Sequence, residues 1–137
     1  MKNINNKNVK SCWNKINNAN GSDYFVEKFY HTLFEQYRGT RDLFPESMKV
    51  QNIALISMLD NVINGIEYID VLEESLAQLG ARHQNMNVPT NMYDVLTEII
   101  VTTAQDASDD SLTDEELKDW EYAFKAISDL MTKGYSK

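Results

Sequence analysis

Apolar side chains recur at helical spacing along almost the whole chain, and few residues interrupt them. Only two prolines, Pro45 and Pro89, and five glycines occur among the 137 residues. Because proline and glycine are the strongest helix breakers, their scarcity favours long helices. No stretch shows the alternation of apolar and polar residues that is typical of a half-buried strand. The sequence therefore predicts one all-α domain over residues 1–137, with about six to eight helices of uneven length.

The apolar spacing also predicts where these helices lie. The longer ones are expected within residues 1–20, from 22 to near 38, from about 47 to 65, from 70 through 83, around 93–103 and through 120–131. Ser22 is the expected N-cap of the second helix. Asp70 and Glu73 suit a capping box for the fourth. Thr113 and Glu116 suit another before the last.

The charge balance excludes some classes of partner. Lys and Arg number 13 against 21 Asp and Glu, which gives a formal net charge of −8. Nucleic acids and anionic membranes select basic surfaces, so neither is expected as a partner. The N-terminus has no apolar core like that of a signal peptide, and no apolar run approaches about 18 residues. A soluble, cytoplasmic protein is expected.

Several kinds of site are missing from the sequence. A single cysteine, Cys12, excludes an intramolecular disulfide and a multi-cysteine metal site, and we expect it to be a small core or boundary residue. No glycine-rich phosphate loop, Gly-x-Ser-x-Gly motif or His-Glu-x-x-His motif occurs. The acidic stretch 106–116 lacks the pattern of a calcium loop and is expected to be a solvated connection.

The two histidines differ in their surroundings. His31 follows Tyr30 directly and would point about 100° away from it on a helix, which predicts a surface or boundary position. His83 ends the helical stripe of Leu72, Leu76 and Leu79, so its ring should lie along an apolar face. Taken alone, a single histidine on an apolar face is more often a hydrogen-bonded core residue than a metal ligand, and both interpretations stay open for His83.

The order of motifs around His83 is more specific. Seven of the fourteen aromatic residues fall between Tyr24 and Phe44. The sequence then runs through Leu43-Phe44-Pro45, Gln51 with Leu55 one turn later, and Leu79-Gly80-Ala81-Arg82-His83. In this order the chain resembles the globin family, specifically bacterial single-domain globins related to the haem domain of flavohaemoglobins and, more distantly, neuroglobin-like proteins. The resemblance covers essentially the whole chain and implies a globin fold around haem b, iron protoporphyrin IX.

The resemblance assigns roles to individual residues. His83 is the implied proximal ligand of the iron, and its second ring nitrogen would donate to the Leu79 carbonyl. Phe44 matches the phenylalanine that stacks on the porphyrin, although a plain core residue would be equally buried. Tyr30 and Gln51 match the distal residues that face a bound gas. The remaining implied haem contacts are Leu55, Leu79, Val88, Tyr93 and Leu96.

The sequence departs from the family pattern on both sides of the haem. If the distal assignment slips by one residue, Val50 replaces Gln51 as an apolar gate, and Lys49 beyond it offers an amine to the iron. On the proximal side, the glutamate that flavohaemoglobins place late in the last helix aligns with Tyr135. This exchange removes a charge near the proximal histidine and argues against peroxidase-like chemistry.

The distal pair implies a function. Dioxygen bound to iron carries partial negative charge, so hydrogen bonds from Tyr30 and Gln51 would hold it tightly, whereas carbon monoxide would gain less. Tight retention suits nitric oxide dioxygenation to nitrate, with a separate reductase because no reductase domain is expected after residue 137. Three alternatives stay open: non-catalytic scavenging, storage or sensing of dioxygen; a distal pair that bonds only itself or a water; and a haem-free interaction module.

Overall fold

The computed structural model describes residues 4–136 and contains only helices and connecting loops within them. This confirms the predicted all-α class. The elements in chain order are α1 (Asn6–Ala19), α2 (Ser22–Gln36), the 3₁₀ helix η1 (Arg38–Leu43), α3 (Lys49–Asn64), the 3₁₀ helix η2 (Ile66–Leu72), α4 (Glu73–Asn85), α5 (Met92–Ala107) and α6 (Asp114–Thr132).

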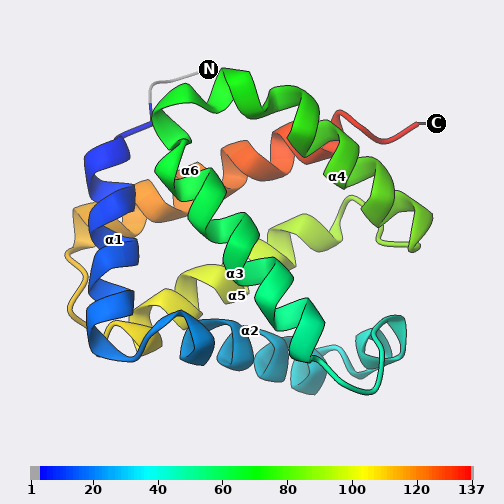
Figure 1. The fold of residues 1–137 in the computed structure, drawn as a ribbon, viewed down its shortest axis with the longest axis horizontal. Coiled ribbons are helices and arrows are strands. Elements are labelled where there is room, and N and C mark those ends of the chain that lie inside the picture. The colour runs from blue at the N-terminus through cyan, green and yellow to red at the C-terminus, as the bar shows by residue number, and fades with distance from the viewer. Residues whose placement is uncertain (1–3, 137) are drawn as a thin grey trace.

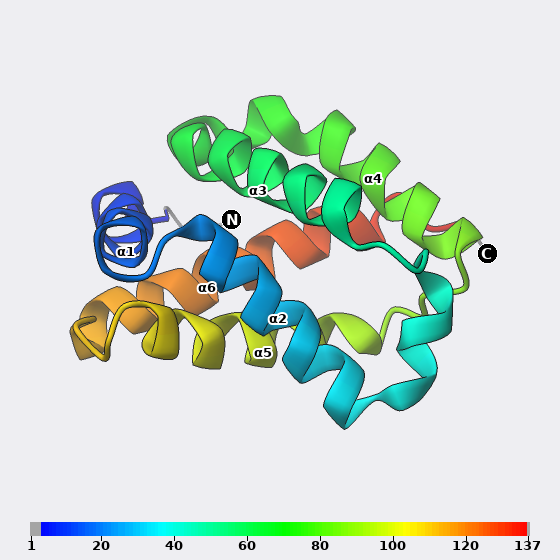
Figure 2. The same ribbon diagram turned by 60° about the horizontal axis from the view of Figure 1, so that its bottom comes forward.

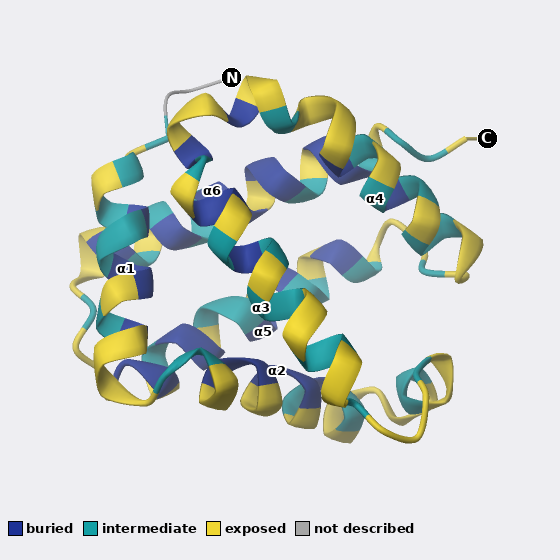
Figure 3. Ribbon diagram, viewed as in Figure 1, coloured by how far each residue is buried: buried dark blue, intermediate teal, exposed yellow. Residues whose placement is uncertain are grey.

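The helices cross one another at steep angles rather than forming a parallel bundle (Figure 1). α3 and α4 lie on one side of the molecule, and α2 and α5 lie on the other (Figure 2). α6 contacts both α4 and α5 and so joins the two sides, while α1 closes one end against α6. Buried residues form stripes along the inward faces of the helices (Figure 3), as the apolar spacing predicts.

Three aromatic side chains form the centre of the core at the α1 end. The rings of Trp13 and Trp120 stack with centroids 6.2 Å apart, and Phe25 meets both edge-on. Each of the three is at most 4% exposed. Such aromatic pairs add to the hydrophobic free energy of burial, so this cluster fixes α1 and α2 against α6.

The helix starts agree only partly with the sequence predictions. Thr113 accepts from the Glu116 N–H while the Glu116 carboxylate accepts from the Thr113 N–H, which confirms the capping box. Ser22 is already the first residue of α2, and the N-cap is Gly21 with a φ of 93°, so the predicted Ser22 cap is wrong by one position. The predicted Asp70–Glu73 box is also wrong, because Asp70 lies inside η2 and α4 begins without a side-chain cap.

The crossing of α4 and α6 depends on two glycines. A Cβ atom at Gly80 would clash with the backbone of Met131, and one at Gly134 would clash with the backbone of Ala77. Because neither position has room for a side chain, the backbones of α4 and of the end of α6 lie in direct contact. This contact fixes the helix that carries His83.

Three further sequence expectations can be compared with the fold. Cys12 is completely buried, and its thiol donates to the Glu116 carbonyl at 3.3 Å, as expected of a core residue. His31 is exposed and lies 3.4 Å from the Glu35 carboxylate, as expected of a surface residue. Among the described residues, no helix combines the length and hydropathy that crossing a bilayer requires.

Candidate functional site

A cavity of about 460 Å³ lies among α2, α3, α4, α5 and α6, and most of its lining is apolar. All nine residues that the sequence singled out contribute to its wall: Tyr30, Phe44, Gln51, Leu55, Leu79, His83, Val88, Tyr93 and Leu96. They come from four α-helices and two loops, so the fold assembles them from distant parts of the chain. The cavity falls within the size range of ligand and cofactor sites, roughly 300–1,000 Å³.

His83 lies in the last turn of α4 with its ring at the cavity wall. Its Nδ1 atom lies 2.8 Å from the carbonyl oxygen of Leu79, one turn earlier in the same helix. Because a carbonyl only accepts, Nδ1 must carry the hydrogen, which leaves Nε2 as the nitrogen with a free lone pair. No described residue hydrogen-bonds to Nε2. His83 is therefore set up to ligate through Nε2.

Tyr30 and Gln51 form a polar pair in the otherwise apolar wall. The Gln51 amide donates from Nε2 to the Tyr30 hydroxyl oxygen at 3.0 Å, which joins α3 to α2. Tyr30 is 6% exposed, and burial raises the pKa of its phenol, although the bond from Gln51 acts in the opposite direction. The phenol therefore stays protonated at neutral pH, and its hydrogen has no acceptor among the described residues.

Phe44 completes an aromatic group next to this pair. Its ring meets Tyr30 edge-on at 5.4 Å and Phe34 edge-on at 5.3 Å, while Tyr30 stacks on Phe34 at 5.8 Å. Arg41 lies over the Phe34 ring and donates to the Pro45 and Glu46 carbonyls, which fixes the loop after η1. The aromatic group thus holds Tyr30 in one position at the cavity wall.

Val50 and Lys49, the two alternatives to Gln51 as the distal residue, lie outside the cavity lining. Val50 is 78% exposed, and neither Val50 nor Lys49 contributes to the cavity wall. On α3, only every third or fourth residue can face the same side, and Gln51 and Leu55 share the side that faces the cavity. The geometry places Gln51, rather than its neighbours, beside Tyr30.

A second hydrogen-bonded group lies around His83. The rings of His83 and Tyr93 have centroids 6.4 Å apart, and the Tyr93 hydroxyl lies 3.1 Å from that of Tyr135. The Tyr135 hydroxyl donates to the Val88 carbonyl at 2.7 Å. Burial and the bond to Tyr135 both raise the pKa of Tyr93, so the Tyr93 phenol stays protonated at physiological pH.

Sequence reasoning did not assign several other lining residues. The apolar ones include Phe29, Leu33, Met58, Ile100, Phe124 and Ile127. Their helical spacing marks them as core, but spacing alone cannot separate a residue that lines a cavity from one that fills the interior. Thr40, Arg82 and Asn87 add polar groups to the lining. Of these three residues, only Arg82 belongs to the motif that ends at His83, and it is exposed on α4.

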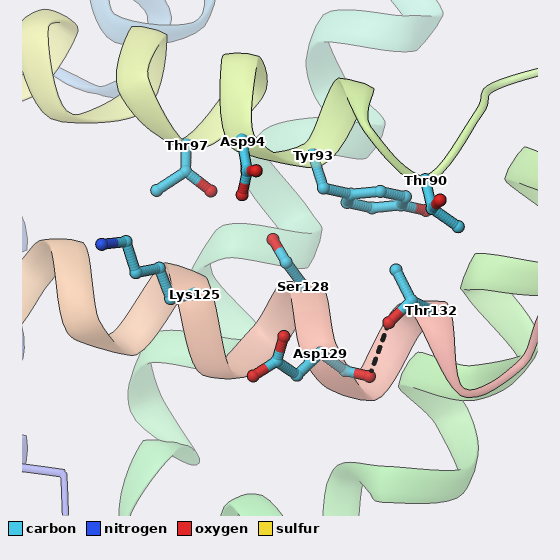
Figure 4. A pocket seen from close by; sticks show the side chains of 8 residues that line it. All are labelled: Thr90, Tyr93, Asp94, Thr97, Lys125, Ser128, Asp129 and Thr132. Carbon is cyan, nitrogen blue, oxygen red and sulfur yellow. Dashed lines mark hydrogen bonds between the residues drawn. The ribbon is translucent and has the colours of Figure 1, made fainter.

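A smaller cavity of about 210 Å³ lies between α5 and α6, and its lining residues are of polar types (Figure 4). Asp94 and Thr97 reach into it from α5, and Ser128 faces them from α6. Tyr93, Thr97 and Ser128 line both cavities, so one layer of side chains separates the polar cavity from the apolar one. Nucleophile, base and carboxylate do not come together there in the manner of a hydrolase triad.

The lining of the large cavity fits a haem group. The cavity lining is apolar, as a porphyrin requires, His83 could offer Nε2 to a metal, and the Leu79 carbonyl fixes the orientation of that ring. Tyr30 and Gln51 supply polar groups from other helices around the same cavity. No described group of three or more His, Cys, Asp or Glu side chains could hold a metal ion directly.

Comparisons with known proteins agree with this fold. The model of the globin family matches residues 27–131. A flavohemoprotein of Oceanobacillus iheyensis is 23% identical over 108 residues, a match that covers 77% of this chain and only 27% of that protein. The chain thus spans about a quarter of the length of this curated relative.

Solved structures give the same result. An engineered carbene transferase, a variant of a candidate nitric oxide dioxygenase from Rhodothermus marinus, superimposes with a TM-score of 0.82 at 20% identity, over 97% of this chain and 92% of that one. A bacterial globin from Campylobacter jejuni superimposes with a TM-score of 0.79 at 21% identity, over 96% and 97% of the two chains. The chain therefore belongs to the globin family, which implies a haem cofactor and the binding of diatomic gases.

Proposed function

We propose that this globin binds dioxygen tightly at haem b and uses it to convert nitric oxide to nitrate, with electrons from a separate reductase. One observation carries the proposal: Gln51 donates to Tyr30 in the wall of the cavity that also contains His83. A globin that released dioxygen readily would not need two hydrogen-bonding side chains in this position. The likeness to a flavohemoprotein and to a candidate nitric oxide dioxygenase supports the same function.

His83 would hold the iron through Nε2. Its Nδ1–H bond to the Leu79 carbonyl keeps the ring from rotating and makes Nε2 a better donor. Phe44 and Leu55 would contact the porphyrin from the side of the distal pair, with Leu79, Val88, Tyr93 and Leu96 contributing the other apolar contacts. When bound, the haem iron supplies a site for dioxygen and the single electron by which nitric oxide and dioxygen become nitrate.

Tyr30 would act directly on the gas and Gln51 would act through Tyr30. Because the Gln51 amide donates to the phenol oxygen, it polarises the O–H bond and makes the phenol hydrogen a stronger donor. That hydrogen has no acceptor among the described residues, so it is available to a ligand in the cavity. A ligand with negative charge on its outer atom gains from this donor, while carbon monoxide gains less.

The surroundings of Tyr93 favour a second function, non-catalytic binding of dioxygen. The partner of Tyr93 is the Tyr135 hydroxyl and not a carboxylate, so this hydrogen bond brings no negative charge towards the His83 ring. Such a histidine supports reversible binding and offers less help to oxidative chemistry. Storage or scavenging of dioxygen would then be the function.

The first test is the visible spectrum of protein purified with haem supplied. We expect a Soret band in the wild type and in His31→Ala, whose histidine is exposed, and loss of that band in His83→Ala. The oxygenated protein is then mixed with nitric oxide in a stopped-flow instrument. Formation of one nitrate per haem within milliseconds supports the dioxygenase, and a slow reaction supports storage. Failure of the wild type to take up haem would overturn both.

A further inference from the structure

The residues that follow α6 form hydrogen bonds to two positions shortly after His83, Gln84 and Val88. Gln84, the next residue along α4, donates from Nε2 to the Ser136 carbonyl at 2.6 Å and accepts from the Ser136 N–H at 2.9 Å. Beyond the end of α4, Tyr135 donates to the Val88 carbonyl, and the Val88 N–H donates to the His83 carbonyl at 3.0 Å. Figure 1 shows this C-terminal segment running beside the end of α4.

The directions of these hydrogen bonds follow from the donors available. The Tyr135 hydroxyl has one hydrogen, and the Val88 carbonyl can only accept, so the hydrogen goes to Val88. The 3.1 Å contact between the two tyrosine hydroxyls is then a bond from Tyr93 to Tyr135. The Tyr135 ring also meets the Tyr93 ring edge-on at 6.0 Å. Tyr135 therefore joins the loop after α4 to the start of α5.

These contacts act on the part of α4 that would otherwise be least constrained. His83 lies in the last turn of α4, which ends at Asn85, and the last carbonyls of a helix lack partners within it. The bond to Leu79 fixes the His83 ring relative to α4 only. The backbone contacts at Gly80 and Gly134 hold α4 against α6 before that last turn. The last turn itself gains the pair of hydrogen bonds between Gln84 and Ser136, together with the bond from Tyr135 to Val88.

We propose that Gln84, Tyr135 and Ser136 form a proximal latch that sets where His83 stands in the haem cavity. They are positioning residues, because they act through α4 and do not line the cavity themselves. The inference rests on the proposed role of His83 as the iron ligand. If the latch opens, the last turn of α4 moves more freely, and the histidine presents Nε2 over a wider range of positions.

The chain offers a matched control for this latch. Lys133 lies 3.6 Å from the Glu73 carboxylate, so this ion pair also joins the end of α6 to α4. Glu73 is the first residue of α4, ten positions before His83, and both side chains of the pair are more than half exposed. Breaking the pair removes a contact between the same two helices without touching the turn that holds His83.

The test compares Gln84→Met and Tyr135→Phe with Lys133→Met. Methionine keeps the length of the Gln84 side chain but cannot pair with the Ser136 backbone, and phenylalanine keeps the Tyr135 ring but not its hydroxyl. The first readout is hydrogen exchange of the Val88 amide by NMR, on the protein as it purifies. We expect roughly five- to tenfold faster exchange in both latch variants and no change in Lys133→Met. The second is the iron–histidine stretching band of the ferrous protein by resonance Raman, which should shift or broaden only in the latch variants.

The two readouts separate the latch from the proposed function. Unchanged Val88 exchange in both latch variants overturns the latch, whether or not the protein binds haem. An unchanged iron–histidine band in the loaded latch variants also overturns it, because His83 would then keep its position without these contacts. Faster exchange in a protein that takes up no haem would support the latch while the proposed function fails. Equal changes in all three variants would show general loosening of α4 and would also overturn the latch.

Discussion

Gln51 donates a hydrogen bond of 3.0 Å to the hydroxyl oxygen of Tyr30, and this bond connects α3 to α2 at the wall of the large cavity. The bond occupies a lone pair of the phenol oxygen and leaves the phenol hydrogen free. The two residues are therefore unequal: Tyr30 is the donor available to a ligand, and Gln51 orients and polarises it.

Removing the Tyr30 hydroxyl should accelerate release of dioxygen more than release of carbon monoxide. For Tyr30→Phe we expect the dioxygen dissociation rate to rise about five- to thirtyfold, which corresponds to loss of one strong hydrogen bond. Gln51→Leu should have a smaller effect in the same direction. Both rates are measured by stopped-flow mixing of the oxygenated or carbon monoxide form, with Val50→Ala, a change at an exposed neighbour, as the control. Equal acceleration for both gases would mean that the substitution changes how easily gases enter and leave the cavity, and not a hydrogen bond to dioxygen.

The sequence predicted the helices well where local residue patterns determine the structure. It failed where packing between distant parts of the chain determines it. Asp70 and Glu73 have the spacing of a capping box, but Ile66 and Ile69 are buried and hold the segment before α4 as a 3₁₀ helix. The backbone leaves helical geometry at Tyr68, with a φ of −118° and a ψ of 39°. A capping motif describes only four residues, so it cannot predict that Asp70 already belongs to the preceding 3₁₀ helix, η2.

The same distinction applies to the site. The bond from His83 to Leu79 was predictable because the two residues are one helical turn apart. The pairing of Gln84 with Ser136 was not, because 52 residues separate them and neither type marks a site. Family resemblance predicted which residues line one cavity, and only the structure supplied the partners from distant parts of the chain.

Adding one methyl group at Gly80 should destabilise the protein strongly. The new Cβ atom would clash with the Met131 backbone, which cannot move away without separating α4 from α6. We expect Gly80→Ala to lower the free energy of unfolding by at least about 2 kcal/mol, as measured by urea denaturation. The control is Gly39→Ala, since a Cβ atom there meets nothing within 4 Å. Equal stability of the two variants would contradict the close crossing of α4 and α6.

The Cys12 thiol should be inert in the folded protein. Burial is the main cause that raises its pKa from 9.0 to about 12, and the nearby Glu116 carboxylate adds to the effect. The thiolate that attacks a disulfide reagent is therefore scarce, and the side chain is completely buried. At pH 8 we expect the native protein to react with an aromatic disulfide reagent roughly a hundredfold or more slowly than the same protein in guanidinium chloride. Rapid labelling of one thiol per native chain would show that α1 opens easily from α6.

Glu116 should make the protein more stable above pH 5 than at pH 2. Burial alone would raise the pKa of this carboxyl, but the bonds from Lys15, Ser11 and Thr113 outweigh it and lower the pKa from 4.5 to about 2. The folded state therefore holds the ionised form, and its contribution is complete above the ordinary pKa. As the pH falls from about 5 towards 2, the unfolded chain takes up the proton first, and the stabilisation is lost.

This loss is measured as the difference between the wild type and Glu116→Gln in urea denaturation at several pH values. We expect the wild type to be more stable by about 1–2 kcal/mol at pH 6, and the gap to close by pH 2. The full pKa shift would give more, but the Lys15 ammonium is partly exposed and solvent screens the pair. Glu115→Gln is the control, because Glu115 is exposed in the same helical turn. If wild type and Glu116→Gln are equally stable from pH 6 to pH 2, Glu116 contributes only as the second half of the capping box, through bonds that glutamine can also make.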